Sequence, residues 1–143
     1  MSDVAPGTSS PARDPIAVRL QGVVKRFADT VVLFPLGRVD HATADKLKAE
    51  LAPHMGNCAG ERDRVVIDMT GVEYISSVGL RVLMLASKQA KAQGCTLAVC
   101  GLQPVVREIF EISRFNLVLK VFPALREALG AISADALAAF EAA

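Results

Sequence analysis

The stretch from Val65 to Lys91, which reads VVIDMTGVEYISSVGLRVLMLASKQAK, is the most informative part of this chain about its fold. It begins with a short β-branched run closed by Asp68 and Gly71, a pattern that predicts a strand buried on both faces. Two serines, residues 76 and 77, then precede a periodic apolar segment, where helix N-caps commonly lie. The stretch therefore predicts a buried strand, an acidic turn and a helix with a pair of hydroxyl groups at its N-terminus.

The helix predicted from Val78 to Ala92 has two unlike faces. A rotation of about 100° per residue groups small and branched residues that we expect to pack on a sheet: Gly79, Val82, Leu83, Ala86 and Ala90. The opposite face mixes cations with large apolar groups: Ser77, Arg81, Met84, Leu85, Lys88 and Ala92. We expect this second face to bind a partner. The simpler interpretation of the two serines is that they only cap the helix, which is worth about 1 kcal/mol.

The composition limits what the chain can be. Its 143 residues, 52% of them apolar, suffice for one sizeable core and favour a single domain. Lysine and arginine total 16 against 15 acidic residues, so no general field favours nucleic acid or an anionic membrane. No apolar run reaches the roughly 20 residues that span a bilayer, and Asp3 stands where a signal peptide would be basic. We therefore expect a cytoplasmic protein that neither binds nucleic acid nor inserts into a membrane.

Strands and helices are expected to alternate along the chain. We expect strands at residues 16–27, 31–36, 65–67, 95–100 and 117–122, the first two forming a hairpin that ends over 37–40. We expect helices at 43–54, 78–92 and 103–113 and one that starts at Ala124, with Pro123 in its first turn and Gly94 ending the central helix. A polar loop is expected at 55–64. This order predicts an α/β fold: a mixed sheet of four to five strands with about four helices packed against it.

The expected domain organisation is simple. Residues 1–15 are rich in proline, glycine and serine and are expected to form a flexible leader. Residues 16–130 are expected to form the domain. Residues 131–143 are rich in alanine and are expected to form a C-terminal helical extension or tail.

The three cysteines, Cys58, Cys95 and Cys100, lack the close pairing of a zinc site or a redox motif, and we expect reduced structural thiols. His54 and Cys58 could share a helix face, but no third or fourth ligand follows. The glycines are isolated and do not form a phosphate-binding loop. We therefore expect no metal and no cofactor.

Two segments carry family motifs. Residues 37–44, GRVDHATA, are similar to the pattern G-x-[LIV]-D-x-x-T-A, and residues 68–83, DMTGVEYISSVGLRVL, are similar to a block with the core D-S-S-G-L or D-S-T-G-L. Both patterns are found in the STAS domain family. The resemblance is closest to the bacterial anti-sigma factor antagonists and runs from about residue 31 to residue 129. It implies a single STAS-like domain that acts by protein binding and is not an enzyme.

The resemblance also implies a phosphorylation switch. In these antagonists, the hydroxyl residue after the core aspartate is phosphorylated by a kinase that is also the anti-sigma factor. That position is Ser77 here; Ser76 stands at the aspartate position and Val78 at the second hydroxyl position. Another functional aspartate of the family falls on Asp40. The implied partners are an anti-sigma factor serine kinase and a serine phosphatase, and the implied partner-binding residues are Asp40, Ser76, Val78, Arg81, Met84, Leu85 and Lys88.

Two other functions stay open. The changes at Ser76 and Val78 would fit a STAS subunit of another assembly, such as a stress-sensing complex or the cytoplasmic accessory part of a lipid transporter. A small hydrolase would need a nucleophile, a base and an orienting acid, for which Ser77, His41 and Asp40 are the candidates.

Overall fold

The computed structural model describes residues 24–55 and 64–143. The predicted leader, the first part of the predicted hairpin and nearly all of the predicted polar loop lie outside these residues.

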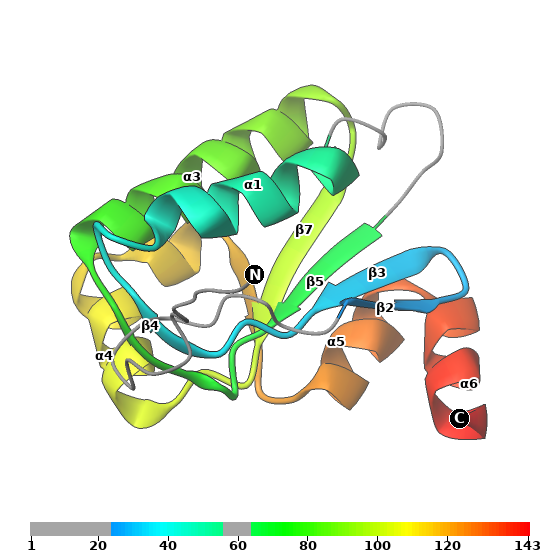
Figure 1. Cartoon of the computed structure of the whole chain (residues 1–143). Coiled ribbons are helices and arrows are strands. Elements are labelled where there is room, and N and C mark those ends of the chain that lie inside the picture. Colours follow the sequence, from blue (N-terminus) through cyan, green and yellow to red (C-terminus); the bar gives the residue numbers. More distant parts are fainter. Residues whose placement is uncertain (1–23, 56–63) are drawn as a thin grey trace, which may run out of the picture.

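A five-stranded mixed sheet runs through the centre of the domain (Figure 1). Its strands lie in the order β2 (Val24–Phe27), β3 (Thr30–Leu33), β5 (Arg64–Asp68), β7 (Thr96–Cys100) and β8 (Lys120–Phe122). β2 and β3 form an antiparallel hairpin, and every other neighbouring pair in this sheet is parallel. The predictions of a hairpin and of a partly parallel sheet are confirmed.

Helices cover both faces of this sheet (Figure 1). One face carries α1 (Ala44–Met55), α3 (Ser77–Ala92) and α4 (Pro104–Ile112), whose buried residues join one core cluster. The other face carries α5 (Leu125–Ile132) and α6 (Ala134–Ala142), which cover a smaller cluster. The predicted single α/β domain is confirmed, and the expected C-terminal extension is helical. The predicted domain boundaries stay predictions.

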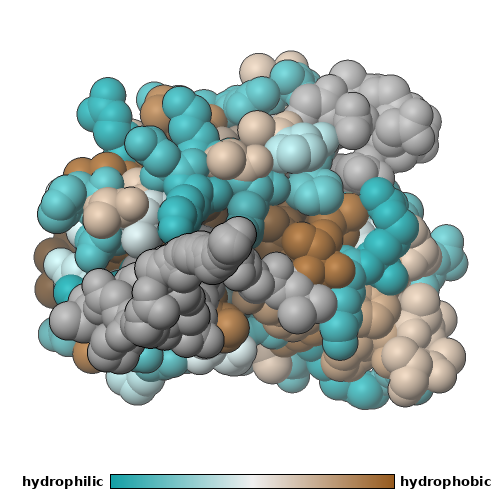
Figure 2. Space-filling view, viewed as in Figure 1, coloured by the Kyte–Doolittle hydropathy of each residue, from teal (hydrophilic) through white to brown (hydrophobic). Residues whose placement is uncertain are grey.

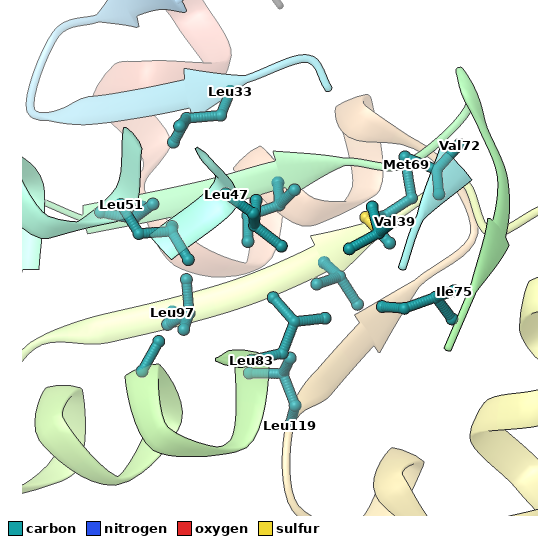
Figure 3. Close-up of a cluster of buried hydrophobic side chains, with 14 of the residues drawn as sticks. Leu33, Val39, Leu47, Leu51, Met69, Val72, Ile75, Leu83, Leu97 and Leu119 are labelled. Carbon is teal, nitrogen blue, oxygen red and sulfur yellow. The ribbon is translucent and has the colours of Figure 1, made fainter. Parts of the chain in front are cut away.

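The strands are apolar throughout because both of their faces are buried. Val65 and Ile67 point into the larger cluster, whereas Val66 between them points into the smaller one. Figure 3 shows the larger cluster, in which side chains from α1, α3 and β7 converge: Leu47, Leu51, Leu83 and Leu97.

A second, two-stranded sheet was not predicted. β4 (Gly37–Val39) pairs in parallel with β6 (Val72–Ile75). The prediction that residues 37–40 only end the hairpin is wrong, and so is the prediction that an acidic turn leads straight into the central helix. Val39 and Ile75 are both buried in the larger cluster, which explains why these short segments pair instead of forming loops.

Two further boundaries differ from the predictions. The segment predicted as a strand from residue 117 begins as a 3₁₀ helix, η2 (Phe115–Leu117), because Phe115 turns inward to make an edge-on contact with Phe110, with ring centroids 5.1 Å apart. Pro123 is not in the first turn of α5. Ala124 is the N-cap of that helix, so Pro123 lies just outside it.

Candidate functional site

The N-terminus of α3 presents one serine to the helix and the next to solvent. Ser76 is the N-cap: its backbone is extended, and its Oγ accepts a hydrogen bond of 3.3 Å from the N–H of Gly79. Ser77 is the first residue of the helix and is exposed. Capping, the simpler interpretation of the pair, therefore accounts for Ser76 and leaves the hydroxyl of Ser77 without this role.

The two predicted faces of α3 are largely confirmed. Gly79, Leu83, Ala86 and Ala90 are buried, as expected, and so is Ser87, which the sequence did not single out. Val82 is only half-buried because it lines a groove against α1.

On the opposite face, the side chains predicted to contact a partner are mostly exposed. Arg81 and Lys88 are exposed, and Leu85 is 47% exposed although it is apolar. Met84 differs, because it is half-buried and packs against the larger core cluster.

Asp40 directly follows β4 and is held in a tight turn. Its Oδ1 accepts a hydrogen bond of 3.0 Å from the N–H of Ala42 and lies 3.2 Å from the hydroxyl of Thr43. The Thr43 hydroxyl also accepts a hydrogen bond of 3.0 Å from the backbone N–H of Asp40. These contacts fix the direction in which the half-buried carboxylate projects.

The pairing of β4 with β6 brings this turn next to α3. Val39 pairs with Ile75, and the backbone N–H of Ser76 donates a hydrogen bond of 2.8 Å to the carbonyl of Val39. Asp40 directly follows Val39, and Ser77 directly follows Ser76. Residues from the two sequence motifs, 37–44 and 68–83, therefore meet at one end of the small sheet.

A pocket of about 430 Å³ lies beside Ser77 and is largely apolar; its lining residues are Ser77, Val78, Leu80, Arg81, Met84, Ser113 and Phe115. The first five come from α3. Ser113 and Phe115 come from the end of α4 and from η2. They were not predicted as site residues because neither belongs to a motif.

The exposed side of α3 is positively charged. The helix contains Arg81, Lys88 and Lys91 but no acidic residue. Hydrophilic side chains with scattered hydrophobic ones line the α1 and α3 side of the molecule in Figure 2. With no carboxylate in its first turn, the positive end of the helix dipole is not neutralised by a neighbour on the helix.

The described residues give little support for a hydrolase or for a metal site. His41 is exposed, and within residues 24–55 and 64–143 no hydrogen bond joins it to Ser77. No group of three or more potential metal ligands occurs in this part of the chain.

The cysteines differ from one another. Cys100 is a free thiol whose pKa is raised to about 12 by burial and by the carboxylates of Asp68 and Glu127, so it is a poor nucleophile. Cys95 is disulfide-bonded, so the prediction of three reduced thiols is wrong at this residue. Cys58 lies outside the described residues.

Comparison with known proteins places this arrangement in a family. The model of the STAS domain matches residues 21–128. The chain belongs to the STAS domain family. Its β4 turn and the start of α3 are thus part of a STAS domain, as the motifs suggested.

Several relatives of this STAS domain are named anti-sigma factor antagonists. BtrV of Bordetella bronchiseptica, which carries that name, is 47% identical over 103 residues, covering 71% of this chain and 84% of BtrV. The crystal structure of an anti-sigma factor antagonist from Mycobacterium paratuberculosis has a TM-score of 0.72 at 22% identity, covering 82% of this chain and 96% of that one.

The anti-sigma factor antagonist SpoIIAA has the same fold. Its unphosphorylated form has a TM-score of 0.64 at 16% identity, covering 81% of this chain and 96% of SpoIIAA. Its phosphorylated form has a TM-score of 0.60 at 15% identity, covering 82% of this chain and all of SpoIIAA.

No helix in the described residues is both long and apolar enough to cross a membrane.

Proposed function

We propose that this STAS domain is an anti-sigma factor antagonist that binds an anti-sigma factor serine kinase, frees a sigma factor, and is switched off by phosphorylation of Ser77. A serine phosphatase restores the active form. The observation that carries the proposal is the exposed hydroxyl of Ser77 at the start of α3, next to the Asp40 turn. The name of BtrV supports the same function.

The fold tolerates a phosphate at this position. Phosphorylation adds about 1.5 to 2 negative charges, and the helix dipole favours an anion at a helix N-terminus by about 0.3 to 1 kcal/mol. Ser76 caps the helix as an aspartate would, but it brings no negative charge next to Ser77. Arg81, one turn further along α3, is exposed and makes no ion pair with a described residue, so it is available to the phosphate.

A docked partner does not tolerate a phosphate on Ser77. The surface around Ser77 is apolar at Val78, which is 42% exposed, and at Leu85. A partner that covers these side chains would bury the phosphate against them and close to the carboxylate of Asp40. A loss of about 3 to 4 kcal/mol from desolvation and repulsion would weaken the complex several hundredfold. Phosphorylation then switches binding and leaves folding intact.

The remaining parts of the proposal concern location and chemistry. The protein acts in the cytoplasm, where sigma factors and their kinases work. It acts by binding and catalyses no reaction of its own; ATP is the substrate of its partner kinase. Subcellular fractionation tests the location. A hydrolytic activity of the purified protein that is lost in His41→Ala would reveal a hydrolase instead.

The binding test uses the anti-sigma serine kinases encoded in the same genome, each purified and titrated with the protein by calorimetry. The parent protein should bind one of them, and Ser77→Asp should weaken that complex at least a hundredfold. Ser77→Asn is the matched control, because it has nearly the size of aspartate without its charge, and it should bind within a few fold of the parent. Equal affinities of Ser77→Asp and the parent would overturn the proposal.

A further inference from the structure

A second pocket lies on α3, at the opposite end of the helix from Ser77. Its volume is about 430 Å³, within the range of small-molecule sites. It is formed by the C-terminal half of α3, the start of β7, η2 and the start of β8. None of its described lining residues belongs to the pocket beside Ser77.

One side chain in this pocket has an unused polar group. Ser87 is only 4% exposed, and its hydroxyl makes no hydrogen bond with any described residue. A helical serine commonly satisfies its hydroxyl by donating to the carbonyl four residues earlier, as Ser113 does to Ile109 at 2.8 Å. Because its oxygen is not fully buried and Ser87 lines the pocket, this hydroxyl is a polar group that a ligand could bind.

The charged residues that line this pocket, within the described part of the chain, are all positive. Lys91 lies one turn after Ser87 on α3, and Lys120 lies on the opposite wall at the start of β8. Neither lysine makes an ion pair with a described residue, and none of the described residues that line the pocket is acidic. The lining also offers the amide of Asn116 and the hydroxyl of Thr96. These groups together favour an anion that accepts hydrogen bonds.

The other walls are apolar. Leu97 and Leu119, which Figure 3 shows near Leu83, line the pocket together with Ala90, Leu117 and Val118. Leu117 is 75% exposed, which leaves an apolar rim at the opening. A ligand that fits the pocket therefore combines an anionic head with a short apolar body.

We propose that the pocket formed by α3, β7, η2 and β8 binds a small amphipathic carboxylate, with Lys91, Lys120 and Ser87 holding the carboxylate and the leucines holding the apolar chain. The site is separate from the partner surface around Ser77 and does not depend on the proposed switch. It gives this domain a small-molecule ligand in addition to its protein partner.

The test is a titration of the ¹⁵N-labelled full chain with sodium hexanoate, followed by NMR. Hexanoate should cause saturating shifts at the amides of Ser87, Thr96 and Asn116, with an affinity on the order of 1 mM. Hexylammonium chloride, which has the same chain and the opposite charge, should not. The absence of saturation with hexanoate, or equal shifts with both compounds, would overturn the proposal.

Matched variants locate the carboxylate. Lys91→Glu and Lys120→Glu should each weaken hexanoate binding about tenfold, whereas Lys88→Glu, which makes the same charge change on α3 outside the pocket, should leave it within twofold. Ser87→Ala should weaken binding about tenfold without lowering the melting temperature, because the hydroxyl that it removes makes no hydrogen bond with a described residue. An equal loss in Lys88→Glu and Lys91→Glu would show only a general charge effect and would contradict the assigned site.

Discussion

The buried and exposed faces of α3 have different roles. Its buried face consists of glycine, alanine, serine and one leucine, which let the helix lie close to β4, β6 and the sheet: Gly79, Leu83, Ala86, Ser87 and Ala90. Its exposed face carries Arg81, Leu85 and Lys88, none of which is needed to fill the core. One helix thus separates the residues that determine stability from those available to a partner.

This separation explains how a switch can act without unfolding the domain. Ser77 lies at the start of the exposed face, next to Ser76, which caps the helix. A charge added to Ser77 reaches solvent and a partner, whereas the cap and the core stay unchanged. Changes on the buried face should therefore lower stability, and changes on the exposed face should leave it nearly constant.

Two leucines on α3 test this contrast most strongly. Leu83 is fully buried and Leu85 is 47% exposed. Leu83→Ala should lower the free energy of unfolding by about 2 to 5 kcal/mol because it leaves a cavity, whereas Leu85→Ala should change it by about 0.5 kcal/mol or less. Urea unfolding measures both variants. Similar losses in the two would show that the faces do not differ in the way described.

Gly79 tests how closely α3 approaches the small sheet. A Cβ at this position would lie 2.7 Å from Cγ1 of Val39 and 2.8 Å from Cγ1 of Ile75. Gly79→Ala should therefore cost about 1 to 3 kcal/mol of stability through overpacking. The control is Gly130→Ala in α5, where the new Cβ would meet Cδ2 of Leu137 at 3.4 Å. Gly130→Ala should stabilise the fold by about 0.5 to 1 kcal/mol. If it instead lowered stability as much as Gly79→Ala, close packing at Gly79 would not be the cause of the loss.

The two serines should differ although they are adjacent. Ser76→Ala removes the cap of α3 and should cost about 1 kcal/mol. Ser77→Ala removes an exposed hydroxyl and should change stability by less than about 0.5 kcal/mol. Thermal melting of both variants measures the difference. A larger loss of stability in Ser77→Ala than in Ser76→Ala would show that Ser76 is not the cap of α3.

Ser77→Asp should have a small effect on stability, with the opposite sign. A carboxylate in the first turn interacts favourably with the helix dipole, so we expect a gain of about 0.3 to 1 kcal/mol at low salt. Because salt screens this interaction, the gain should shrink when the melting temperature is measured in high salt. A melting temperature below that of Ser77→Asn would indicate that charge at this position disturbs the fold, and the switch would no longer be confined to binding.

Much of this arrangement could be predicted from the sequence. The strong periodicity of residues 78–92 predicted α3 and four of its five buried residues, and the continuous apolar run at residues 65–67 predicted β5. Gly94 was expected to end α3, and it adopts a φ of 72°, which is unfavourable for other residues.

The rest depended on contacts between distant segments. β4 and β6 have three and four residues, so neither is long enough to show a strand period, and among the described residues they pair with each other. The pairing that places Asp40 next to the start of α3 was therefore not visible. Ser113 and Phe115 reach the Ser77 pocket only because α4 folds back over the small sheet, and no motif marks them.

The most direct test of the switch is mass spectrometry of the protein purified from its own cells, with site mapping across residues 73–81. We expect phosphate on Ser77 in a fraction of the molecules, and this fraction should change between growth and stress. Complete absence of phosphate from Ser77 under both conditions would contradict it and would favour a STAS subunit that stays constitutively bound in another assembly.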